Sequence, residues 1–131
     1  MKKLINIVLL ATAVTSLELS AHHSVDSRYL RNEISEITGT VKELRWGNPH
    51  TFVILEGNDG REWTLEGVGG HYLLQFGATK DMFAEGKMIT VAGLASRFDL
   101  PELYMGNLLL PDGQEILLAG GAKLRWTNGE D

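Results

Sequence analysis

The chain has 131 residues, 44% of them hydrophobic and 22% charged, with a formal net charge of −5 and no cysteine. This length predicts one domain with a hydrophobic core, and the acidic balance excludes binding nucleic acid through neutralisation of its phosphates, which requires a basic face. The lack of cysteine excludes disulfides, thiolate catalysis and cysteine-based zinc sites.

Residues 1–21 have the order of a cleaved export signal. Lys2 and Lys3 form a positive start, and residues 4–17 form an apolar stretch that is short for a membrane span. Residues 18–21 are polar and end in the small residue Ala21. We therefore expect cleavage after Ala21, a periplasmic or secreted protein, and no stable membrane anchor after cleavage. An uncleaved N-terminal anchor is the alternative.

Cleavage at this point would leave His22 and His23 at the start of the mature chain. The terminal amine and the imidazole of one histidine can chelate a single metal ion, and Cu²⁺ binds nitrogen ligands most strongly among the divalent ions. The alternative is a flexible, soluble beginning without a ligand. Residues 22–33 are polar and mixed, and we expect an extended lead-in there before a barrel domain over 34–131.

The first predicted strand, residues 34–46, ends in a corner that contains a candidate site. Gly39 predicts a bulge or bend within this strand, which lets one strand serve two sides of a small barrel. Pro49 lacks an N–H group and keeps Asn48 extended, so the strand stops at 47–49. His50 follows at once and is held beside a rigid corner, as a binding site requires.

The remaining elements follow from turn signals and alternation. The turn at 57–60 predicts a hairpin, because Asn, Asp and Gly are common in tight turns. Trp63 and Leu65 alternate with polar residues, which is typical of a half-buried strand. The sheet breaks at 67–70 and a short helix ends before Gly77. The predicted ranges are strands 51–56, 61–66, 87–95, 102–110 and 114–118, and a helix over 71–76.

This order predicts an all-β fold: a small, OB-fold-like five-stranded barrel with one short helix between the third and fourth strands. The last predicted strand is an added hairpin. An up-and-down barrel and an incomplete sandwich are the alternatives.

Several of these features together resemble a family of small exported bacterial proteins of unknown function. The resemblance covers the mature chain and implies a secreted barrel of the OB type, with no activity to carry over. Its motifs are Ala21-His22-His23-Ser24, Gly39-Thr40-Val41, Arg45-Trp46 leading into Asn48-Pro49-His50, Trp63 with Glu66, and Pro111-Asp112-Gly113.

The histidines define the first functional hypothesis. We expect His22, His23 and His50 to bind copper, or zinc as second choice, because imidazole and amine nitrogens suit these ions. Glu66 and His71 are candidate additional ligands. The alternatives are that His50 caps a turn and that His71 is a surface or cap residue, neither of them a metal ligand.

The tryptophans define the second hypothesis. Trp46 and Trp63 are expected in the core or at its rim, and the alternative is a platform for a flat ligand on the barrel face. No nucleophile–base motif or phosphate-binding glycine loop is present, so we expect no enzyme activity. The sequence thus predicts an exported copper- or zinc-handling protein, or else a non-metal binding or protein-interaction module that uses the barrel face.

Overall fold

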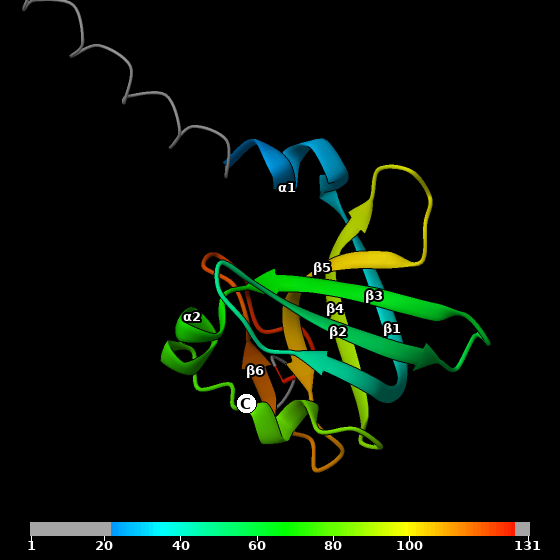
Figure 1. Cartoon of the computed structure of the whole chain (residues 1–131), viewed down its shortest axis with the longest axis vertical. Helices are drawn as coiled ribbons and strands as arrows, with labels where there is room; N and C mark the ends of the chain where they lie inside the picture. Colours follow the sequence, from blue (N-terminus) through cyan, green and yellow to red (C-terminus); the bar gives the residue numbers. More distant parts are fainter. Residues whose placement is uncertain (1–21, 128–131) are drawn as a thin grey trace, which may run out of the picture.

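The structure is a computed structural model that describes residues 22–127 (Figure 1). It is dominated by strands, with two short α-helices and one 3₁₀ helix in this part of the chain. The elements in chain order are α1 (His22–Arg28), β1 (Tyr29–Arg45), β2 (His50–Gly57), β3 (Glu62–Val68), α2 (Gly70–Gln75), η1 (Lys80–Phe83), β4 (Met88–Ser96), β5 (Glu102–Leu109) and β6 (Glu115–Leu117).

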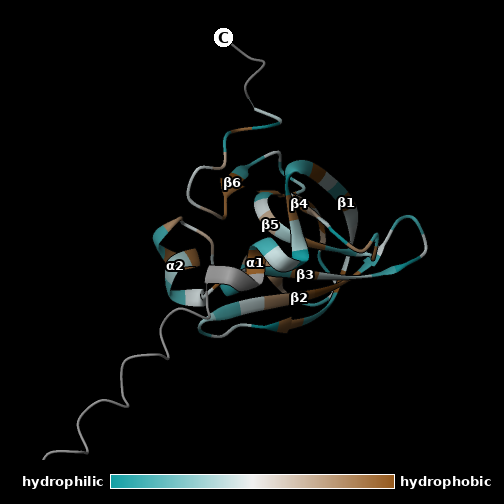
Figure 2. Cartoon of the chain, turned by 90° about the horizontal axis from the view of Figure 1, so that it is seen from above, coloured by the Kyte–Doolittle hydropathy of each residue, from teal (hydrophilic) through white to brown (hydrophobic). Residues whose placement is uncertain are grey.

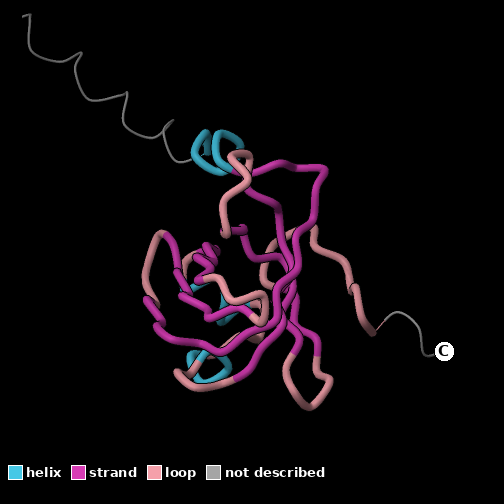
Figure 3. The backbone as a smooth tube through the Cα atoms, turned by 90° about the vertical axis from the view of Figure 1, so that its right-hand side faces the viewer, coloured by secondary structure: helices cyan, strands magenta, loops and turns pink. Residues whose placement is uncertain are grey.

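The strands close into a ring. β1 pairs with both β2 and β4, β2 pairs with β3, and β4 pairs with β5, all antiparallel. A parallel pairing of β3 with β5 completes the circle, while β6 extends the β5 side as an added hairpin. With α2 between β3 and β4, this is the strand order of the OB fold. The all-β, OB-like prediction is confirmed, and Figure 3 shows the strands curling around one another.

The closure depends on β1, which is 17 residues long and changes partners along its length. Its first part pairs with β4 and its last part with β2. Gly39 pairs with both neighbouring strands, since it lies opposite Gly57 of β2 and opposite Ile89 of β4. A Cβ atom on Gly39 would collide with the backbone carbonyl of Glu56. The predicted bend therefore lies at Gly39, and the register shift itself falls between Val41 and Glu43.

The core follows the alternation of the strands. Figure 2 shows hydrophilic and hydrophobic residues succeeding one another along the ribbon. In β3, for example, Trp63 and Leu65 are buried while Glu62 is exposed, because successive side chains point to opposite faces. Full burial of one aliphatic side chain contributes about 1.5–3 kcal/mol. The buried cluster comprises Ile37, Val41, Val53, Leu55, Trp63, Leu65, Leu73, Ala78, Phe83, Ile89, Val91, Leu103, Met105, Leu108, Ile116 and Leu118.

The corner before His50 packs against the start of α2. The amide of Gly70 donates to the carbonyl of Gly47 at 2.8 Å, and a side chain on Gly69 would collide with Asn48. The Asn48–Pro49 peptide bond is cis. Two consecutive glycines thus allow the helix start to lie directly on the corner, which holds the beginning of β2 in place.

Two predictions about the ends of elements need correction. The expected extended lead-in over 22–33 is instead the helix α1 followed by the first residues of β1, which pair with β4 at Ser96 and Ala95. The predicted break at 67–70 begins later, since β3 continues through Val68, opposite His50. The strand residues in both places, Tyr29 and Leu30 and then Gly67 and Val68, have a partner strand whose hydrogen bonds local composition does not reveal.

We expect Gly39→Ala to lower the free energy of unfolding by about 1–3 kcal/mol, because the added methyl group meets backbone that cannot move without opening the β1–β2 pairing. The matched control is Gly120→Ala, where no atom lies within 4 Å of the added Cβ, and its effect should stay within about 0.5 kcal/mol. Urea unfolding of both variants measures the difference. Equal midpoints would contradict the role of Gly39 in closure.

Candidate functional site

His50 and Glu66 meet on the outer face of the barrel. Phe52 of β2 lies opposite Glu66 of β3, so His50, two residues from Phe52, is a diagonal neighbour on the same face. The Nδ1 atom of His50 lies 3.1 Å from Oε1 of Glu66. The two atoms are close enough for an ion pair when the imidazole is protonated, but they are not aligned as a hydrogen bond.

Tyr29 completes this cluster from the start of β1. Its side chain is 1% exposed, and its hydroxyl donates to Oε2 of Glu66 at 2.7 Å. Burial, followed by the hydrogen bond to Glu66 and the charge of that carboxylate, raises the pKa of Tyr29 well above its ordinary value. Tyr29 therefore remains a hydrogen-bond donor, and Glu66 is held between a phenol and an imidazole.

Tyr104 on β5 lies beside the same cluster. Glu66 and Tyr104 are partners in the parallel pairing, and the rings of Tyr29 and Tyr104 are 5.7 Å apart between centroids. Burial, and then the charge of Glu66, raises the pKa of Tyr104. Two protonated phenols thus flank one carboxylate on this face.

A second carboxylate holds α1 against the barrel. Glu102 is 4% exposed and accepts hydrogen bonds from the Arg28 guanidinium, with Nε at 3.1 Å, and from Ser96 Oγ at 2.8 Å. The hydrogen bond to Glu102 raises the pKa of Arg28 further. Arg97 also donates to the carbonyls of Asp26 and Tyr29. Figures 1 and 3 show α1 beside the loop between β4 and β5, as these contacts require.

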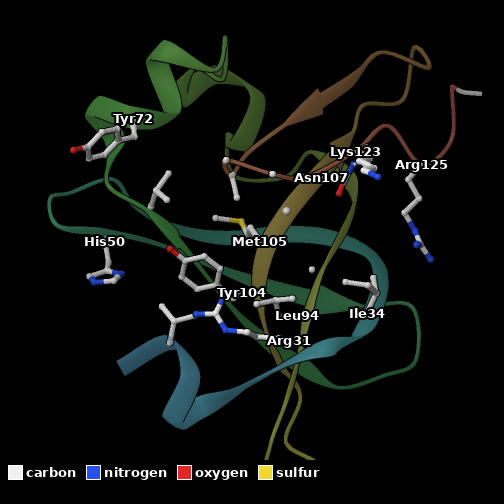
Figure 4. A pocket seen from close by; sticks show the side chains of 18 of the residues that line it. Arg31, Ile34, His50, Tyr72, Leu94, Tyr104, Met105, Asn107, Lys123 and Arg125 are labelled. Carbon is white, nitrogen blue, oxygen red and sulfur yellow. The ribbon is translucent and has the colours of Figure 1, made fainter. Parts of the chain in front are cut away.

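A groove of about 1150 Å³ opens on this outer face, with His50 and Tyr104 among the residues that line it. One wall comes from the α1–β1 region, a second from Pro49 and Tyr72, and a third from residues 119–125. Figure 4 shows His50 and Tyr72 on one side of the view, Lys123 and Arg125 on the other, and Met105 and Leu94 between them. The branched aliphatic residues that line the groove are Val25, Ile34, Val68, Leu94 and Leu124.

The wall at 119–125 is anchored by Glu115 of β6. Its carboxylate accepts hydrogen bonds from the backbone amides of Arg125, Trp126 and Thr127, and from the Thr127 hydroxyl. Partial burial would raise the pKa of Glu115, but the hydrogen bonds outweigh it and lower the pKa to about 2. Asn107 links the same carboxylate to the carbonyl of Lys123. The third wall is therefore tied to the barrel.

The predicted metal ligands lie in different places. α1 contains His22 and His23, but their side chains are outside what the structure describes. His71 lies on α2, is exposed, and contacts Gln75 at 3.2 Å. Among the side chains that the structure describes, which do not include those of His22 and His23, no group of three or more His, Asp or Glu residues could hold a metal ion. Of the predicted residues, the structure brings together His50 and Glu66.

The tryptophans also differ from one another. Trp63 belongs to the core at 6% exposure, and its ring N–H donates to Asp59 at 3.0 Å. Trp63 is therefore not the ligand platform that was the alternative. Trp46 is half-buried at the rim, where it packs against the core and lies 6.3 Å from Phe83 between ring centroids. Gly70 has no side chain, and the Trp46 indole lies where a Cβ atom of residue 70 would be.

Sequence reasoning missed Tyr29, Tyr104 and the groove. The pairing of His50 with Glu66 depends on the register in which Phe52 lies opposite Glu66, and the predicted strands 51–56 and 61–66 around a turn at 57–60 did not establish that register. Tyr29 was hidden within a segment expected to be an extended lead-in. Tyr104 comes beside Glu66 only through the parallel β3–β5 pairing, which no local pattern encodes.

Removal of the Glu66 carboxylate tests this cluster. We expect Glu66→Ala to lower the free energy of unfolding by about 1–3 kcal/mol, because it leaves the buried Tyr29 hydroxyl without its acceptor. Glu62→Ala, on the same strand but exposed, is the control and should change stability by less than about 0.5 kcal/mol. Thermal or urea unfolding reports both. A loss no greater than that of the control would show that the Tyr29 contact is not stabilising.

Comparison with known proteins identifies the family. Residues 9–99 match the model of a family of unknown function, DUF6152, and the chain belongs to this family. No curated protein matches the chain. One similar solved structure, titled "Crystal structure of the ZRD-deleted mutant of TiaS in complex with agmatine", is 14% identical with a TM-score of 0.45. The match covers 70% of this chain and only 23% of that one. Among the described residues, no helix is long and apolar enough to span a membrane.

Proposed function

We propose that this member of DUF6152 is a small binding protein that takes an organic molecule in the groove on its outer barrel face. We further propose that it acts in the periplasm or outside the cell after loss of residues 1–21, as the order of Lys2-Lys3, an apolar stretch and Ala21 suggests. The role is binding without a chemical step.

The groove is the observation that supports this proposal. Its volume of about 1150 Å³ is slightly above the range of about 300–1,000 Å³ that is usual for small-molecule sites. Ile34, Tyr72 and Leu124 line it and are exposed, and exposed large hydrophobic side chains that share one groove are typical of a ligand-binding surface. Polar groups are few and placed among them, including His50, Tyr104 and Asn107. Such a mixture binds an apolar body and orients it.

A neutral fluorescent probe, N-phenyl-1-naphthylamine, tests whether the groove binds apolar molecules. We expect saturable binding by the mature protein and its loss in Gly106→Leu, because Gly106 faces the groove and its Cβ would have room at 3.5 Å from the nearest atom. Circular dichroism checks that this variant is folded.

A matched pair of surface variants makes the same test without filling the groove. Tyr72, which is 57% exposed and lines the groove, and Phe98, which is 62% exposed and lies outside it, are both replaced by Ala. Tyr72→Ala should weaken binding about fivefold through loss of an aromatic contact, and Phe98→Ala should not. Binding that survives both Gly106→Leu and Tyr72→Ala would refute the groove as the site.

Copper binding, with zinc as second choice, is a second candidate, and the position of His50 favours it. Metal-binding histidines commonly have a carboxylate beside the nitrogen that does not bind the metal, as Glu66 lies beside Nδ1 here. Val25 of α1 lines the same groove as His50, and His22 precedes Val25 by three residues, within one helical turn. Glu66 would then orient His50 and not bind the ion.

Calorimetric titration of the mature protein with Cu²⁺ tests this candidate. His50→Ala and one extra residue before His22 should each weaken binding, whereas His71→Ala, which removes an exposed imidazole, should leave it unchanged. Binding should also weaken as the pH falls through ~6.5, because a protonated imidazole cannot bind a metal. Equal effects of His50→Ala and His71→Ala would remove His50 from the site.

A further inference from the structure

The charged residues around the groove are all cationic. Arg31, Lys123 and Arg125 line it together with His50, and none of the 17 Asp and Glu residues of the chain is among its lining residues. The protein as a whole carries a formal charge of −5. The groove of this acidic protein is therefore lined only by neutral and cationic side chains.

The three cations differ in how far their charge is already compensated. Arg31 forms an ion pair with Asp26 at 2.6 Å. Arg125 forms one with Glu36 at 3.0 Å and lies over the ring of Trp126.

Lys123 forms no ion pair with any residue in 22–127, although its backbone carbonyl is held by Asn107 at 2.8 Å. The ammonium group of Lys123 therefore stands on an anchored segment with its charge available to a ligand.

We propose that the groove binds an amphiphilic organic anion, a molecule with an apolar body and one carboxylate or sulfonate group, whose charge pairs with Lys123. This inference rests on the proposed binding function and specifies its ligand class. The apolar body lies along Leu94 and Val68, toward Tyr72 and His50. A long side chain such as Lys123 covers apolar surface with its methylenes while its ammonium reaches the charged group. One uncompensated cation suits a single negative group and not a polyanion.

Two probes that share a skeleton separate charge from hydrophobicity. The neutral N-phenyl-1-naphthylamine and the anionic 8-anilinonaphthalene-1-sulfonate differ by one sulfonate. We expect the anion to bind the mature protein about fivefold more tightly at low salt, the gain from one charge pair at about 4 Å in water. The advantage should shrink at high salt, where the Debye length is shorter.

Lys123→Gln should reduce the ratio of the two affinities, anion over neutral probe, to about one, because any loss of apolar contact affects both probes alike and the charge pair affects only the anion. Lys80→Gln is the matched control, since Lys80 is also exposed but lies on η1 outside the groove. Displacement of the neutral probe by octanoate and by octylammonium provides a second readout that needs no variant, and octanoate should displace it at lower concentration.

The outcomes distinguish the two proposals. If the neutral probe binds in the groove but the anion gains nothing, or if Lys123→Gln and Lys80→Gln behave alike, the anion inference is overturned and the binding function stands. If neither probe shows saturable binding that Gly106→Leu abolishes, both proposals fail. A preference for octylammonium over octanoate also overturns the choice of charge.

Discussion

The double pairing of β1 at Gly39 is the constraint on which the rest of the molecule depends. One strand must approach β2 and β4 closely enough to bond with both, and the carbonyl of Glu56 leaves no space for a side chain at that point. Once β1 bends there, the sheet curls until β3 reaches β5 and pairs with it in parallel. That last pairing brings Glu66 beside Tyr104, so the candidate site is a consequence of closure.

The N-terminal segment packs against the outer face of β3 and β5. Two carboxylates face outward there, Glu66 and Glu102, and each is compensated by a residue from the α1–β1 junction. Tyr29 donates to Glu66, and Arg28 pairs with Glu102. Buried carboxylates require such partners. The same contacts therefore hold the α1–β1 region, which is one wall of the groove, against the barrel. His50 takes the remaining side of Glu66 and faces the groove.

The groove and its charge follow from the same arrangement. Its floor lies on the outward side of β4 and β5, while the nearby carboxylates are occupied elsewhere: Glu66 by Tyr29, Glu115 by the amides of residues 125–127. The side chains that line the groove are then aliphatic, aromatic, neutral polar or cationic, and none is a carboxylate. An apolar surface with a positive rim fits a ligand that carries an apolar body and one negative charge, which links the fold to the proposed binding role.

The sequence by itself determined the strand order, the hairpin at 58–60, the short helix and the rigid corner before His50, because turn chemistry and alternation are local signals. The register of that hairpin, which places His50 and Glu66 on one face, was established only by the structure. Only the tertiary structure decided that Tyr29 meets Glu66 across 37 residues and that Arg28 meets Glu102 across 74. It also turned an expected lead-in into α1 and the start of β1, and placed Trp63 in the core. Such contacts depend on how the barrel closes, and the groove, built from segments between Val25 and Arg125, exists only after closure.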